Sequence, residues 1–178
     1  AAFEAVEDAA LQNVAYLELR FAPQLHRARG LTLTEVVESV LGGLAEGVRQ
    51  RNTRAQAILI GMRSHSEAQN AEVLSAAETY FQSGVCGVDI AGDEVHYPPL
   101  TQWRFFRGAA RRGIPFTIHA GENAGPSFIK EALLLGAKRI GHGVSMRRDK
   151  RLLAYCCDAG VGVELCPTSN LQTRAARS

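Results

Sequence analysis

The chain has 178 residues, of which 46% are hydrophobic and 21% are charged, as in globular domains and unlike disordered or fibrous proteins. Its 20 lysines and arginines nearly balance 18 aspartates and glutamates, so no basic surface favours nucleic acid or an anionic membrane as a partner. Apolar stretches stay well short of the ~20 residues that a membrane-spanning helix needs, and the first residues lack an export-signal pattern. We expect a soluble, cytoplasmic protein of one domain.

The four cysteines are not spaced as a disulfide framework. Cys156 and Cys157 are adjacent, and Cys86 and Cys166 form no Cys-x-x-Cys pair with them. We expect all four to be reduced thiols, as is usual inside cells.

Helical and strand-like patterns alternate along the chain. Phe3, Val6 and Leu11 mark a first helix, and Thr32 with Glu35 forms a capping box before a helix at 36–48. Further helices are predicted at 73–81, 103–110, 126–134 and 152–156. The six predicted strands are 14–21, 57–62, 85–90, 114–118, 138–140 and 161–166.

This alternation predicts an α/β fold, because a helix between two strands makes the strands parallel. Two architectures agree with it, a doubly wound sheet and part of a (β/α)8 barrel. A complete TIM barrel takes ~250 residues and eight strands, so a barrel here would be incomplete, with about six of the eight strands. We expect residues 1–178 to be a single partial catalytic barrel domain whose first and last strands are missing, and which belongs to a longer protein.

All five histidines follow predicted strand ends, the edge where parallel α/β folds bind ligands. His-Ala-Gly-Glu at 119–122 places an imidazole and a carboxylate at one strand end. His119 suits zinc ligation and Glu122 suits proton transfer; the alternative is a backbone-bonded histidine beside a solvated glutamate. The other histidines are His26, His65, His96 and His142.

Gly-His-Gly at 141–143 follows the next strand and suits a general base or an electrostatic contact. Adjacent parallel strands should place His142 beside Glu122, and Glu164 on the following strand could orient the His142 ring or be structural. We interpret His26, His65 and His96 as solvated loop residues, because they lack comparable neighbours.

A glycine and two acidic residues, Gly92, Asp93 and Glu94, follow the strand at 85–90. Gly92 could offer its backbone to a substrate, whereas capping or salt bridging is the favoured interpretation of the two acids. The sequence has no Gly-x-Gly-x-x-Gly after a strand, no P-loop and no Gly-x-Ser-x-Gly. It also lacks the cytidine-deaminase signature, so none of these four chemistries is indicated.

Five motifs together resemble the adenosine deaminase family in order and spacing. They lie at residues 16–23, 89–94, 119–122, 141–143 and 164–170, and so cover nearly the whole chain. The resemblance implies a zinc-dependent amidohydrolase barrel that hydrolyses adenosine and deoxyadenosine to the inosines and ammonia. The implied partner is therefore a small purine nucleoside.

The resemblance also implies roles for single residues. His119 would ligate zinc, Glu122 would carry a proton to purine N1, His142 would assist attack at C6, and Gly92 would contact the purine through its backbone. The family's His-x-His and Asp-Asp motifs do not occur in this sequence. One Zn²⁺ is expected per complete active site, with His119 its single ligand here, and the 178 residues alone are expected to be inactive.

Two alternatives remain open. One is a related aminopurine specificity, for adenine, AMP or an N6-substituted purine nucleotide. The other is a non-catalytic scaffold that keeps the motifs for packing. In each case we expect no nucleic-acid or membrane partner, and we expect the open barrel edges to favour self-association.

Overall fold

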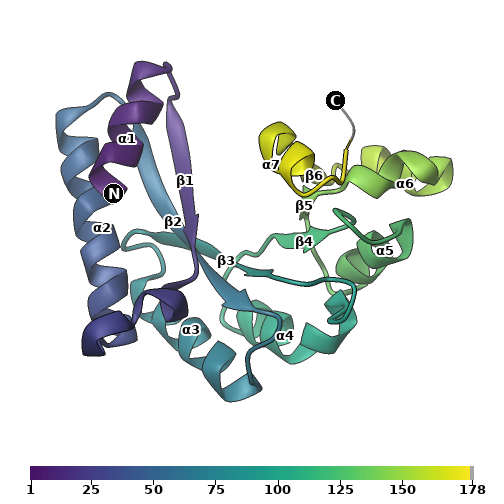
Figure 1. The fold of residues 1–178 in the computed structure, drawn as a ribbon, viewed down its shortest axis with the longest axis horizontal. Coiled ribbons are helices and arrows are strands. Elements are labelled where there is room, and N and C mark those ends of the chain that lie inside the picture. Colours follow the sequence, from purple (N-terminus) through teal and green to yellow (C-terminus); the bar gives the residue numbers. More distant parts are fainter. Residues whose placement is uncertain (177–178) are drawn as a thin grey trace.

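A computed structural model describes residues 1–176, in which six parallel strands alternate with helices (Figure 1). The strands form two three-stranded sheets, ordered β1-β2-β3 and β4-β5-β6. Their bounds are β1 (Tyr16–Phe21), β2 (Arg54–Met62), β3 (Val85–Ala91), β4 (Ile118–Ala120), β5 (Arg139–His142) and β6 (Gly162–Glu164).

Most of the α-helices lie on the outside of the wall, whereas the last one follows β6 and lies on its inner side (Figure 1). The α-helices are α1 (Ala2–Leu11), α2 (Leu33–Gln50), α3 (Glu67–Tyr80), α4 (Trp103–Arg111), α5 (Pro126–Leu134), α6 (Lys150–Asp158) and α7 (Pro167–Gln172). Short 3-10 helices are η1 (Pro23–His26), η2 (Ala28–Gly30), η3 (Pro99–Gln102) and η4 (Val144–Arg148). None of the helices in residues 1–176 has the length and apolar character needed to cross a membrane.

The two sheets meet through a short junction between β3 and the segment before β4. Val88 N–H donates to the Pro115 carbonyl at 3.0 Å, and Thr117 N–H donates to the Val88 carbonyl at 3.1 Å. Pro115 itself has no N–H to give, so the strand expected at 114–118 is reduced to one bridge, and β4 begins only at Ile118. The six strands thereby make one curved wall with β1 and β6 at its ends.

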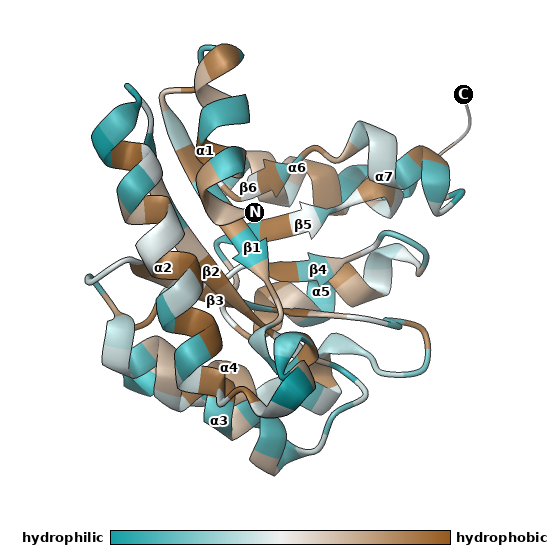
Figure 2. Ribbon diagram, turned by 60° about the vertical axis from the view of Figure 1, so that its left-hand side comes forward, coloured by the Kyte–Doolittle hydropathy of each residue, from teal (hydrophilic) through white to brown (hydrophobic). Residues whose placement is uncertain are grey.

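This wall confirms the predicted incomplete barrel and excludes a doubly wound sheet order. Its core lies between the strands and the helices, and Figure 2 shows hydrophobic segments in β2 and β3 beneath helices of mixed character. Close packing is evident where α1 crosses α2, since a Cβ on Gly47 would lie 2.6 Å from the Val6 Cβ. Fully buried core residues include Val6, Val37, Leu59, Val73, Phe106, Ile118, Ile129 and Ile140.

Candidate functional site

The C-terminal ends of β4 and β5 bring the candidate catalytic side chains together. His119 lies on β4 and His142 ends β5, and their ring centroids are 4.9 Å apart. Glu122 follows β4, and its Oε2 lies 3.6 Å from His142 Nε2, so the two are side by side as predicted. The other oxygen of Glu122 accepts a 2.8 Å hydrogen bond from the Thr173 hydroxyl.

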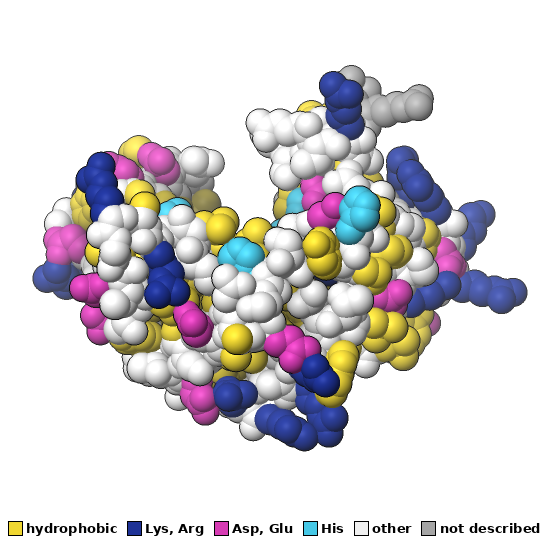
Figure 3. All heavy atoms as spheres, turned by 60° about the horizontal axis from the view of Figure 1, so that its bottom comes forward, with side chains coloured by type: hydrophobic (Ala, Val, Ile, Leu, Met, Phe, Trp, Pro, Cys, Tyr) yellow, Lys and Arg dark blue, Asp and Glu magenta, His cyan; other side chains and the backbone are white. Residues whose placement is uncertain are grey.

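A cavity of about 280 Å³ opens at this point, near the lower end of the volumes of small-molecule sites. It is lined on one side by residues 92–95 of the loop after β3, which include Glu94, and on the other by His119, Glu122 and Asn123. Figure 3 shows histidine side chains along the hollow between the two halves of the molecule. Three separately predicted residues, Gly92, His119 and Glu122, thus line one cavity.

The His119 ring is oriented by a buried carboxylate. Its Nδ1 lies 2.6 Å from Asp89 Oδ2 on β3, and because a carboxylate can only accept, Nδ1 carries the hydrogen and Nε2 is left for a ligand. Burial alone would raise the pKa of Asp89, but His119 and then Arg20 hold it below its usual value. Burial by itself would lower the pKa of His119, but the negative charge and hydrogen bond of Asp89 outweigh burial, so the pKa of His119 is raised.

Charged side chains inside the wall connect its two ends. Arg20 on β1 pairs with Asp89 at 2.7 Å and also with Glu164 on β6. Arg139 on β5 lies 2.9 Å from Glu164 and 2.6 Å from Glu18 on β1. We call this set the inner ionic chain; its members in order are Glu18, Arg139, Glu164, Arg20, Asp89 and His119.

Of the two interpretations left open for Glu164, orientation of His142 is wrong, and the ion pairs of Glu164 agree with a structural role. In the parallel register Glu164 pairs with Gly141, and neighbouring residues of a strand face opposite sides, so its carboxylate meets Arg20 and Arg139 instead. His142 Nδ1 is bonded to Asn170 Oδ1 at 2.7 Å, from α7. His142 also has a φ of 66°, a strained value for a residue with a side chain and one associated with functional sites.

The turn between His119 and Glu122 requires glycine. Gly121 has a φ of 70°, and a Cβ there would lie 2.6 Å from both the Ile129 side chain and the Ser145 hydroxyl. The tight packing fixes the direction in which the chain leaves β4.

The remaining histidines do not line this cavity. His26 and His96 are exposed as predicted, although His26 ends η1, whereas His65 is half-buried. His65 Nδ1 lies 2.9 Å from Gln24 Oε1, and His96 pairs with the exposed Asp93, which also accepts N–H bonds from its own turn. The capping interpretation of Asp93 therefore agrees with the structure. In residues 1–176 no three His, Cys, Asp or Glu side chains are grouped to hold a metal ion.

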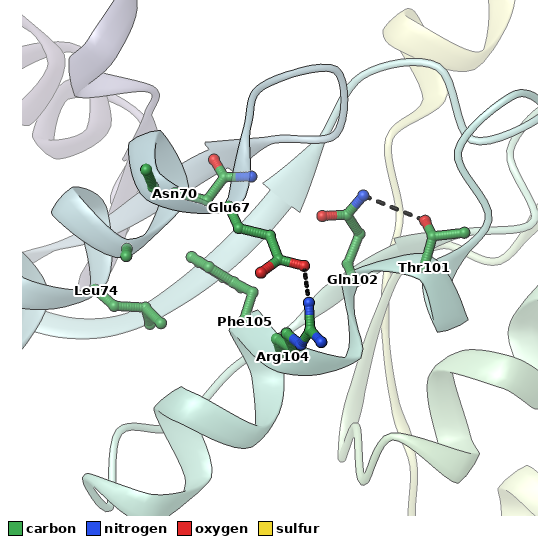
Figure 4. A pocket seen from close by; sticks show the side chains of 9 residues that line it. Glu67, Asn70, Leu74, Thr101, Gln102, Arg104 and Phe105 are labelled. Atoms are coloured by element: carbon green, nitrogen blue, oxygen red, sulfur yellow. Dashed lines mark hydrogen bonds and ion pairs between the residues drawn. The ribbon is translucent and has the colours of Figure 1, made fainter.

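A second cavity, of about 350 Å³, lies on the outer layer between α3 and the η3–α4 segment (Figure 4). Glu67 and Arg104 form an ion pair at its wall. Asn70 exchanges two hydrogen bonds with the Met62 backbone, at 3.0 and 2.9 Å, and Gln102 donates to the Arg63 carbonyl at 3.3 Å. These side chains hold the end of β2 in place.

Sequence comparison agrees with the motifs. The family model described as Adenosine deaminase matches residues 1–178. An adenosine deaminase from Enterococcus faecalis is 38% identical over 178 residues, which are 100% of this chain and 53% of that protein. The chain therefore spans about half the length of the curated relatives it matches.

Solved structures share the curved wall. An adenine deaminase from Arthrobacter aurescens superposes with a TM-score of 0.90 at 30% identity, over 98% of this chain and 54% of its own. An Arabidopsis protein in complex with IMP gives 0.86 at 26% identity, over 98% and 53%. A zinc-bound amidohydrolase from Burkholderia ambifaria gives 0.90, over 99% and 49%, and at 24% identity shows the fold alone. The chain belongs to the adenosine deaminase family.

Proposed function

We propose that the complete protein hydrolyses adenosine and deoxyadenosine to inosine and deoxyinosine, releasing ammonia, with one zinc ion in the site. The proposal is carried by one observation: Gly92, His119 and Glu122 line a single cavity, and His142 adjoins Glu122. We place this activity in the cytoplasm, with a small purine nucleoside as the partner.

His119 has the arrangement of a zinc ligand. Metal-binding histidines commonly donate their other ring N–H to a carboxylate, as His119 does to Asp89. Zinc, when bound, lowers the pKa of a water ligand to about 7. The further ligands that zinc requires would come from parts of the complete protein beyond these residues.

Glu122 is placed to handle the proton. Thr173 holds one carboxylate oxygen and His142 lies beside the other. A protonated Glu122 would donate to purine N1, which withdraws electron density from C6 and prepares it for attack by water. His142, whose Nδ1–H is held by Asn170, presents Nε2 on the Glu122 side and can accept a hydrogen bond from the water.

Gly92 has no side chain, so the edge of the purine could approach its backbone closely. Its φ of 112° suits glycine, and an added Cβ would meet Arg63 and Met62 atoms only at 3.7 Å. At Gly92 the wall of the cavity consists of backbone atoms. A backbone N–H there can donate a hydrogen bond to a ring nitrogen.

The test is Glu122→Gln in the complete protein. Zinc content should be unchanged, and kcat for adenosine should fall by about 10²–10⁴-fold, because only proton transfer is lost. Glu78→Gln, which breaks an ion pair with Arg112 on the outer helices, is the matched control. Undiminished turnover by Glu122→Gln would contradict the proposed role.

A related aminopurine specificity is the second candidate, supported by the likeness to an adenine deaminase and to a protein that binds IMP. Adenosine, adenine and AMP carry a 6-amino group and N6-methyl-AMP a methylated one, so in each case the same residues would act on a C6–N bond. Comparing kcat/KM for adenosine, adenine, AMP and N6-methyl-AMP separates the candidates. Absence of turnover for all four by zinc-loaded protein would favour a non-catalytic scaffold.

A further inference from the structure

Glu94 contacts the backbone on both sides of Glu122. It lies in the loop after β3 and is 6% exposed. One of its oxygens accepts from Gly121 N–H at 2.8 Å, and the other accepts from Asn123 and Ala124 N–H at 2.6 and 2.8 Å. A single carboxylate therefore fixes the turn that carries the proposed acid.

These three bonds do not belong to a helix. α5 begins only at Pro126, after Gly125, so the donors are loop amides that no repeating structure would satisfy. Buried amides without acceptors are costly, and a carboxylate acceptor gives stronger bonds than a neutral one. Both oxygens of Glu94 accept hydrogen bonds from backbone N–H groups. The carboxylate therefore stabilises the loop, and we do not assign it a proton transfer to a substrate.

Arg63 contacts the backbone at the start of the same turn, at His119. It is 1% exposed, and its guanidinium donates to the His119 carbonyl at 2.5 Å and to the Tyr97 carbonyl at 2.7 Å. Burial lowers the pKa of Arg63, and the negative charge of Glu94 is the largest opposing influence. Arg63 thus ties the loop after β3 to the strand that presents His119.

The backbone of Arg63 is held in place by two further hydrogen bonds. Its N–H donates to the Ala91 carbonyl at 2.9 Å, and its carbonyl accepts from Gln102, in the wall of the outer cavity (Figure 4). The contacts therefore run from η3 through Arg63, which directly follows β2, to the backbone of the candidate site.

We propose that Glu94 and Arg63 are positioning residues that hold Glu122 and His119 in their working geometry. This inference deepens the proposed deaminase function and rests on it. Neither side chain needs to touch the substrate; each acts through backbone atoms of the 119–124 turn.

The experiment uses Glu94→Gln in the complete, zinc-loaded protein. A glutamine has the same shape but only one acceptor oxygen, so at least one of the three amides loses its partner. We expect kcat per bound zinc to fall by about 10–100-fold, with a smaller change in KM. Amide hydrogen exchange at Gly121, Asn123 and Ala124 should accelerate at least tenfold, while exchange in β2 stays unchanged.

Glu35→Gln is the matched control, because Glu35 also accepts a backbone N–H, from Thr32 at 2.8 Å, but on the outer helix α2. It should leave kcat and exchange in the 119–124 turn unchanged. If Glu94→Gln does not fold, Glu94→Asp keeps the charge while shortening the reach, and the same two readouts should move in the same direction.

Two outcomes would overturn the inference: normal exchange in the turn, or activity that falls only in proportion to bound zinc. Failure of the wild-type protein to deaminate any 6-aminopurine would instead refute the proposed function. The exchange measurement distinguishes the two failures, because it requires no turnover.

Discussion

Each side chain of the candidate site has one orienting partner on another element. Asp89 on β3 orients His119, Asn170 on α7 orients His142, and Thr173 just after α7 holds Glu122. None of these partners is adjacent in sequence to the residue it orients. The site is therefore built by tertiary contacts, and its chemistry depends on how α7 and β3 are placed.

A single thiol gives a pH-dependent prediction at this scale. Burial, and after it the negative charge of Glu18, raises the pKa of Cys86 to about 11. At pH 8 only about one thiol in 10³ is then the reactive thiolate, so iodoacetamide should modify exposed Cys157 well before Cys86. The Cys86 rate should rise about tenfold per pH unit up to pH 11. Peptide mass spectrometry measures both rates, and equal rates at pH 8 would contradict the assignment.

At the scale of elements, the start of α3 is a measurable contribution to stability. Ser66 and Gln69 form a reciprocal capping box, in which the Ser66 hydroxyl accepts from Gln69 N–H and the Gln69 side chain accepts from Ser66 N–H. Ser66→Ala should lower the free energy of unfolding by about 1 kcal/mol. Urea denaturation of the complete protein measures this, with the exposed mid-helix Ser75→Ala as control. An equal effect of both variants would refute a capping role.

The sequence predicted most helices and strands correctly, because capping residues and hydrophobic periodicity act between residues that are close in the sequence. The Thr32–Glu35 capping box forms as expected and begins α2, and all six strands lie near their predicted places. The pattern could not show that Pro115 would interrupt pairing before β4, or that α7 would follow β6. Both depend on partners far away in the sequence, as α7 is fixed by the bonds of Asn170 and Thr173 to the site.

The residues of the candidate site also divide into those that a local pattern marks and those that depend on partners far away in the sequence. His119, Glu122, His142 and Gly92 stand out because strand ends and glycine-flanked motifs mark them in the sequence. Arg20 and Asp89 were missed, although both fall within the motifs of the family resemblance. An arginine or aspartate within a strand has no local signature, since its importance arises only when β1 and β3 face one interior.

At the scale of the whole molecule, the exposed ends of the wall predict self-association. Leu165 beyond β6 is 84% exposed and Tyr16 on β1 is 47% exposed, and both end strands have free backbone edges within the described part of the chain. The 178-residue chain prepared alone should therefore form dimers or larger species. Sedimentation velocity over a range of concentrations measures this, and a monomer throughout would contradict the expectation.

The inner ionic chain gives the wall a mechanical property. Between β3 and the segment before β4 the Val88 backbone forms only two hydrogen bonds, so this line is the natural hinge between the two sheets. The ion pairs Arg20–Glu164 and Glu18–Arg139 join β1 to the second sheet across the interior and oppose its opening. Asp89, which forms an ion pair with Arg20, also orients His119. Because Asp89 lies on β3 and His119 on β4, a wider angle between the sheets would pull the carboxylate away from the imidazole that we propose to bind zinc. Substitutions on the outer helices that strain the wall are consequently expected to loosen the Asp89–His119 pair without touching the cavity.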